Sequence, residues 1–158
     1  MAQSEGKRFE EDFHKSIPYD YWFYRFKDNA SSFSGGENTR FTTSNICDCE
    51  VMADKYLFLI ELKSHLGVSI PFTCIRNNQI EEMSKIEHNR IKPYFIFNFR
   101  DKEKTYAIYA KKIKMFIELG ERKSIPIAWC EENGIEIESI KKKVRYKYNL
   151  EKFFKTVV

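Results

Sequence analysis

The chain has 158 residues and a formal net charge of +4, from 27 Lys and Arg against 23 Asp and Glu. Hydrophobic residues make up 42% of the sequence and aromatic residues 16%, which supplies a packed core and excludes an intrinsically disordered chain. No apolar run approaches the roughly 18 residues of a membrane span, and the first residues do not resemble a secretory signal. We therefore expect a cytoplasmic protein with no membrane segment, folded as a single domain over residues 1–158.

The charge is distributed unevenly along the chain. Residues 1–50 carry 6 basic and 9 acidic side chains, whereas residues 111–158 carry 12 basic and 7 acidic side chains. A protein that binds a polyanion and also holds cations in a carboxylate cluster would show this pattern. A basic tail is also common in proteins that bind nothing charged.

The first predicted element is an amphipathic helix. Phe9 and Phe13 lie four residues apart and Pro18 closes the segment, so we expect a helix over residues 7–17. The aromatic run over residues 21–26 then predicts a strand.

A long polar segment and a hairpin follow. The stretch near residues 27–43 is rich in Asn, Ser, Gly and Thr, and we expect a loop or short stalk there. Residues 48–52 and 56–63 predict two strands joined by a tight turn. The second strand is almost entirely apolar for six residues, so we expect it to be central and buried on both faces.

The second half of the chain continues with helices and strands. The expected elements are a helix capped by Asn77 or Asn78 that carries Ile80, Met83 and Ile86, strands over 93–99 and 105–109, a helix over 113–119, a short strand over 135–140 and a terminal helix near 150–154. A helix inserted after the central strand of a meander indicates an α/β or α+β fold. We expect one mixed central β-sheet flanked by helices.

Three charged side chains stand where packing gives no reason for them. Glu61 and Lys63 end the apolar strand on one face, and burying either charge unpaired would cost several kcal/mol. Asp48 begins the preceding strand, so the hairpin can bring one carboxylate from each strand together. Two carboxylates and a backbone carbonyl suit Mg²⁺ or Mn²⁺. Solvated strand ends or cross-strand ion pairs remain the structural alternative.

Other kinds of site have little support in the sequence. The four cysteines form no CxxC pair and lack a histidine at zinc-finger spacing. The three histidines are scattered, and no glycine-rich phosphate loop is present. Zinc fingers, zinc proteases and nucleotide-binding loops are therefore not expected.

The position of the three charged residues resembles a known motif. Glu61 lies 13 positions after Asp48 and is followed two residues later by Lys63. This resembles the PD-(D/E)xK nuclease superfamily, in which the Asp and Glu bind a divalent cation and the Lys supports attack on the phosphodiester. Three further segments resemble the RecU-type Holliday-junction resolvases of that superfamily: Gly6-Lys7-Arg8-Phe9-Glu10, Thr43-Ser44-Asn45-Ile46-Cys47-Asp48 and Asn78-Gln79-Ile80-Glu81-Glu82-Met83.

The resemblance covers about residues 6–100 and implies a restriction-endonuclease-like fold with defined roles. It implies that Mg²⁺ or Mn²⁺ is held by Asp48, Glu61, the carbonyl of Leu62 and Glu10. Lys63 would be the catalytic lysine, and Gln79 would orient the site or the scissile phosphate.

Two departures from the RecU pattern affect these expectations. The segment over residues 27–43 is shorter than the stalk that enters the junction in the family, which makes junction selectivity less secure than nuclease identity. Arg40 in this segment is expected to contact DNA, together with Phe33 and Phe41. Cys47 replaces the Thr that precedes the Asp in the family, so a role for that hydroxyl does not carry over.

A basic stretch near the end of the chain is the main candidate for phosphate binding. Residues 141–147 contain five basic residues and an aromatic one. Lys142 and Arg145 are expected to contact DNA phosphates, and a solvated strand edge protected by lysines is an equally weighted alternative.

These observations favour a Holliday junction resolvase, a Mg²⁺-dependent endonuclease that cuts four-way or branched DNA symmetrically as a homodimer. Two alternatives stay open. One is another PD-(D/E)xK endonuclease that acts on duplex or branched DNA. The other is a non-catalytic DNA-binding accessory protein of recombination.

Overall fold

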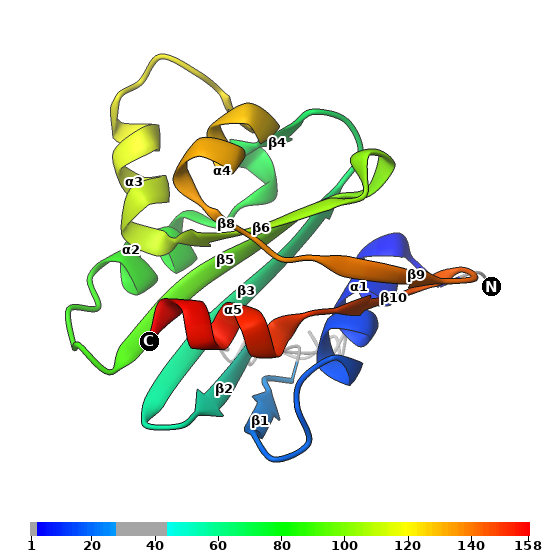
Figure 1. Ribbon diagram of the computed structural model, residues 1–158. Helices are drawn as coiled ribbons and strands as arrows, with labels where there is room; N and C mark the ends of the chain where they lie inside the picture. Colours follow the sequence, from blue (N-terminus) through cyan, green and yellow to red (C-terminus); the bar gives the residue numbers. More distant parts are fainter. Residues whose placement is uncertain (1–2, 28–43) are drawn as a thin grey trace, which may run out of the picture.

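The computed structural model describes residues 3–27 and 44–158 (Figure 1). The loop or stalk expected near residues 27–43, and with it Arg40, Phe33 and Phe41, lies almost wholly outside the described residues. Among those residues no helix is both long enough and apolar enough to cross a membrane.

A mixed central sheet organises the described part of the chain. Its six strands, in spatial order, are β1 (Trp22–Arg25), β2 (Cys49–Ala53), β3 (Tyr56–His65), β5 (Ile91–Phe99), β6 (Lys104–Tyr109) and β8 (Ile135–Glu136). Strands β3 and β5 pair in parallel and every other neighbouring pair is antiparallel. The predicted α+β fold with a mixed sheet is confirmed.

Helices cover both faces of the sheet (Figure 1). One face packs against α1 (Glu5–Lys15), α5 (Leu150–Val157) and a hairpin of β9 (Ser139–Lys142) and β10 (Arg145–Tyr148). The other face packs against α2 (Asn77–Ser84), α3 (Ala110–Glu118) and α4 (Ile127–Asn133). Two short strands, β4 (Ser69–Pro71) and β7 (Ser124–Pro126), pair beside this second face, and single 3₁₀ turns span Phe72–Cys74 and Arg100–Lys102.

Strand β3 is the buried centre that its apolar sequence predicts. It pairs with β2 on one side and β5 on the other, and five consecutive residues, Phe58 to Leu62, are buried. Because side chains alternate, Phe58, Ile60 and Leu62 join the core under α1 and α5, while Leu59 joins the core under α2 and α3. Glu61 therefore points to the α2 side, away from the larger aromatic core.

Two local expectations are corrected by the structure. The N-cap of α2 is Arg76, with no capping side chain; Asn77 and Asn78 lie inside the helix, and Asn78 Nδ2 instead donates to Ser44 Oγ at 2.6 Å. The strand expected over residues 135–140 is split, because β8 ends at Glu136 and β9 begins at Ser139. Between them, the Ile137 N–H donates a hydrogen bond to the Thr105 carbonyl, and the Ile137 side chain is buried in the core under α1 and α5.

Gly134, where α4 returns to the sheet, has close neighbours on several sides. A Cβ added there would lie 2.3 Å from Ile108 Cδ1 and 2.8 Å from the Cys130 carbonyl oxygen. We expect Gly134→Ala to destabilise the fold by roughly 1–3 kcal/mol, measured by urea unfolding, because the surrounding core has to shift. Gly6→Ala is the matched control, since nothing lies within 4 Å of its Cβ position. Equal unfolding midpoints for the two variants would contradict this.

Candidate active site

The structure brings Asp48 and Glu61 together across the β2–β3 hairpin. Cys49 pairs with Ile60, and the Asp48 N–H continues this ladder by donating to the Ile60 carbonyl at 3.0 Å. Asp48 is therefore placed opposite Glu61, on the same face of the sheet. Its Oδ2 accepts a hydrogen bond from the Leu62 N–H at 2.7 Å, which fixes the carboxylate at the edge of the strand.

Two more side chains hold Glu61 in place. Its side chain is only 1% exposed, and Oε2 accepts a hydrogen bond from Gln79 Nε2 on α2 at 2.9 Å. Its other oxygen, Oε1, lies 2.7 Å from Lys63 Nζ, two residues along the same strand. The predicted grouping of Asp48, Glu61, Lys63 and Gln79 is thus present, assembled from three elements.

Burial raises the pKa of both carboxyl groups. For Glu61 burial is the larger cause and the Asp48 charge adds to it, so its pKa rises to about 7 although Lys63 opposes the shift. Burial also raises the pKa of Asp48, opposed by the Leu62 N–H, Lys63 and Arg25. Two carboxylates held together in a poorly solvated place are typical of a site that a cation neutralises.

The donor set fits a hard divalent cation. Gln79 Oε1 is buried and has no hydrogen-bond partner among the described residues, so this oxygen is an available acceptor beside the carboxylates. The N–H and C=O of one strand residue point to the same edge, so the Leu62 carbonyl faces the Asp48 side together with the Leu62 N–H. Carboxylate and carbonyl oxygens are the ligands that Mg²⁺ and Mn²⁺ prefer.

Glu10 is placed on α1 and engages a different partner. Its Oε2 accepts a hydrogen bond from Arg25 Nη2 at 3.1 Å, and Arg25 lies opposite Cys49 at the end of β1. Within residues 3–27 and 44–158, no three His, Cys, Asp or Glu side chains are grouped closely enough to hold a metal. The metal-binding role implied for Glu10 stays a prediction.

Arg25 is a cation near the site that the sequence did not single out. Its charge lowers the pKa of Asp48, against the effect of burial. Antiparallel pairing of β1 with β2 places Arg25, the last residue of β1, opposite Cys49 and therefore next to Asp48. Without knowing that β1 and β2 pair, this placement could not be read from the sequence.

The basic residues of the β9–β10 hairpin are not all free to bind phosphate. Arg145 Nε lies 2.6 Å from Asp12 Oδ1 and Arg145 Nη2 lies 2.9 Å from Glu11 Oε2, so its guanidinium binds α1. Asp12 is buried and also accepts a hydrogen bond from the Tyr146 N–H. Lys142 is exposed on β9, where it stays a candidate for phosphate contact.

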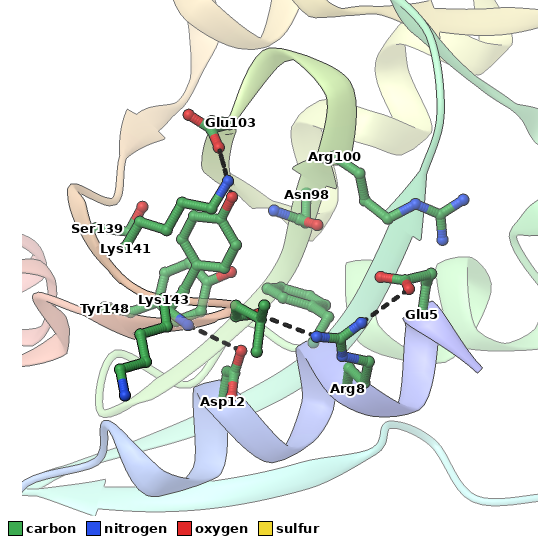
Figure 2. A pocket seen from close by; sticks show the side chains of 13 residues that line it. Glu5, Arg8, Asp12, Asn98, Arg100, Glu103, Ser139, Lys141, Lys143 and Tyr148 are labelled. Carbon is green, nitrogen blue, oxygen red and sulfur yellow. Dashed lines mark hydrogen bonds and ion pairs between the residues drawn. The ribbon is translucent and has the colours of Figure 1, made fainter. Parts of the chain in front are cut away.

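A pocket lies between α1 and this hairpin (Figure 2). Its lining includes Arg8 and Asp12 of α1 at the bottom of the view, Lys141 and Lys143 of the hairpin, and Arg100 of the turn after β5. Arg8 and Lys141 are already paired, with Glu5 and Glu103 respectively. The lining mixes four basic with three acidic side chains, so the pocket does not form a simple anion site: Arg8, Arg100, Lys141 and Lys143 against Glu5, Asp12 and Glu103.

Comparison with known proteins decides the family. A family model described as RecU, Recombination protein U, matches residues 7–152. The chain belongs to the RecU family. It is also 34% identical over 168 residues to the SPbeta prophage-derived uncharacterized protein YotM of Bacillus subtilis strain 168, covering 96% of this chain and 85% of that protein. The resemblance predicted from four short motifs is confirmed, and its phage-derived relative agrees with a phage-encoded origin.

The raised pKa of Glu61 predicts a pH-dependent stability in the RecU-family chain. Between pH 4.5 and about 7 the unfolded chain has lost the Glu61 proton while the folded chain keeps it, so stability falls as the pH rises through this range. The free energy of unfolding of the wild type should fall over this range, and we expect Glu61→Gln to reduce that fall by about 1–3 kcal/mol. The measurement is urea unfolding with a chelator present. Glu87→Gln, an exposed carboxylate, is the control. Identical pH dependence in wild type and Glu61→Gln would refute the assignment.

The ion pairs of Arg145 predict a structural role for this residue. Arg145→Gln removes a charged partner from the buried Asp12, so we expect a lower unfolding midpoint. Lys142→Gln, on the exposed part of the same hairpin, should leave the midpoint unchanged and instead reduce the salt dependence of DNA binding. If both variants unfold like the wild type, Arg145 does not anchor the hairpin to α1.

Proposed function

We propose that the chain is a metal-dependent DNA endonuclease that resolves four-way junctions. The observation that carries the proposal is the meeting of Asp48, Glu61 and Lys63 where β2 begins beside β3, in a chain that belongs to the RecU family. The buried Glu61 carboxylate beside the half-buried Asp48 favours a catalytic role over solvated strand ends, because Glu61 has no packing reason to be buried.

The residues present would hold Mg²⁺ or Mn²⁺ through Asp48, Glu61 and the carbonyl of Leu62. When bound, such a cation polarises a phosphate and lowers the pKa of a water molecule. The protein contributes a preformed geometry, because Asp48 is fixed by the Leu62 N–H and Glu61 by Gln79 before any ligand enters.

Lys63 and Gln79 have distinct tasks in this proposal. Lys63 is anchored to Glu61 Oε1, so its ammonium is held beside the carboxylates and stabilises negative charge that develops on the phosphate. Gln79 donates to Glu61 through Nε2 and leaves Oε1 as an acceptor for a water proton. Gln79 therefore orients both the ligand carboxylate and the attacking water.

The roles proposed for the two carboxylates predict that substituting them abolishes cleavage of DNA but not binding to it. We expect Asp48→Asn and Glu61→Gln to keep junction binding and to lose at least ~10²–10³-fold in Mg²⁺-dependent cleavage, since each removes one electrostatic stabiliser. Cleavage is measured on an immobile four-way junction with purified protein, and binding on the same junction in Ca²⁺. Glu50→Gln, on the same face of β2, is the matched control.

A linear duplex with the sequence of the junction arms tests the substrate class. Preferential cleavage of the junction supports the resolvase, whereas equal cleavage of both substrates would assign the chain to another nuclease of the superfamily. Full cleavage by Asp48→Asn would rule out the proposed site. Binding without any cleavage by the wild type in Mg²⁺ or Mn²⁺ would favour a non-catalytic accessory protein.

A further inference from the structure

Unpaired basic side chains gather at the end of the sheet where its two parallel strands finish. Strand β3 ends at His65 and β5 at Phe99, which are paired neighbours, and Arg100 follows Phe99 directly. Within residues 3–27 and 44–158, the side chains of His65 and Arg100 form no hydrogen bond or ion pair. The carboxyl ends of parallel strands are a common place for ligand sites, so both side chains stand where a ligand is expected.

The pocket between α1 and the β9–β10 hairpin continues this surface (Figure 2). Its acidic side chains are already neutralised, whereas two basic side chains of its lining, Arg100 and Lys143, have no ion pair in the described part of the chain. Figure 2 shows Arg100 and Lys143 on opposite sides of the pocket. The lining therefore keeps two free positive charges, which favour an anion. The neutralising pairs are Glu5 with Arg8, Asp12 with Arg145 and Glu103 with Lys141.

A hydrogen bond fixes the turn that carries Arg100 against the end of β3. Asp101 Oδ1 accepts from the Gly67 N–H at 2.8 Å, which joins the loop after β3 to the turn after β5. This bond lowers the pKa of the Asp101 carboxyl, and the Lys102 and Arg100 charges lower it further. Asp101 is thus one negative charge beside Arg100 and the exposed Lys102, so the turn stays positive at its surface.

Strand β3 places this end of the sheet directly after the candidate active site. Side chains alternate along a strand, so Glu61, Lys63 and His65 share the α2 face, and two steps of ~3.3 Å separate Lys63 from His65 by ~6.6 Å. Arg100 lies one strand spacing and one residue step beyond His65, about 6 Å away between backbone positions. Basic side chains therefore follow one another from the carboxylates toward the pocket at intervals of about one nucleotide.

We propose that His65, Arg100 and Lys143, here called the end track, bind phosphates of the DNA strand that leaves the Asp48–Glu61 site. The strand passes around the carboxyl ends of β3 and β5, from the α2 side of the sheet to the α1 side. The Arg100 guanidinium holds a phosphate through two parallel N–H donors.

This assignment rests on the proposed nuclease function and adds the path of the substrate strand. An acidic protein segment would meet the same charges. The end track favours DNA because it begins two residues from Lys63, on the same face as the carboxylates that would hold the cation. A strand bound at that cation continues onto the nearest free positive charges, which are those of the end track.

Binding of an immobile four-way junction tests the end track. Fluorescence anisotropy in Ca²⁺ measures affinity over a range of salt concentrations. We expect Arg100→Gln/Lys143→Gln to bind roughly 10-fold more weakly, with a salt slope flatter by about two, since two phosphate contacts are lost. The control is Lys55→Gln/Lys92→Gln, which removes the same charge at the opposite end of β3 and β5, where both lysines lie over the Tyr56 ring. It should bind like the wild type.

A second measurement tests the order of the contacts. Single phosphates of one junction arm are replaced by neutral methylphosphonates, one position at a time from the branch point. Wild-type binding should weaken at the positions that the end track contacts. We expect Arg100→Gln to lose sensitivity at one position and His65→Ala at the neighbouring position. Arg100→Lys, which keeps the charge, should recover most of the salt slope.

Three outcomes would overturn the end track: an unchanged salt slope in Arg100→Gln/Lys143→Gln, an equal loss of affinity in the Lys55→Gln/Lys92→Gln control, or the same methylphosphonate profile in wild type and Arg100→Gln. Circular dichroism verifies that each variant is folded. Because the readout is binding in Ca²⁺, a chain that binds through Arg100 and never cleaves in Mg²⁺ keeps the end track and rejects the nuclease. A chain that cleaves without any dependence on Arg100 rejects the end track alone.

Discussion

The burial of the Glu61 carboxylate on the central strand is the constraint on which the candidate site depends. A carboxylate there is unfavourable alone, and three groups surround it from different directions: Lys63 on its own strand, Gln79 on α2 and Asp48 across the hairpin. Lys63 and Gln79 stabilise the ionised form, whereas Asp48 opposes it. The site is therefore preorganised and electrostatically incomplete, which is the state that a divalent cation relieves.

Helix α1 links this site to the rest of the molecule. Phe9 and Phe13 pack into the core, Asp12 binds Arg145 and the Tyr146 N–H of the hairpin, and Glu10 binds Arg25 of β1. One helix thus fixes both the basic hairpin and the end of the strand beside Asp48. The acidic residues of the first third and the basic residues of the last third partly neutralise each other through these pairs. The net charge of each region consequently overstates how much charge is free to bind DNA.

Several elements were predictable because their local pattern is strong. The i, i+4 spacing of Phe9 and Phe13 specified α1, although the Ser4 cap starts the helix at Glu5 and the Ser16 cap ends it at Lys15. The apolar run before Glu61 specified the buried strand β3. The cap of α2 was predicted wrongly because Asn78 has a tertiary partner, Ser44, which no local pattern reveals. Likewise, five basic residues in seven indicated a surface for phosphate, but could not reveal that Arg145 is paired.

The sequence by itself determined the RecU family and pointed to the candidate carboxylates and the candidate lysine, because the spacing from Asp48 to Glu61 and Lys63 is a local property of two adjacent strands. Only the tertiary structure decided which other side chains surround them. The hydrogen bond from Gln79 depends on how α2 packs, and the position of Arg25 depends on the pairing of β1 with β2. The exposure of Trp22 and Tyr24 on β1 likewise follows from strand order. Strand order is set by burial and pairing across the whole chain, which residue spacing does not encode.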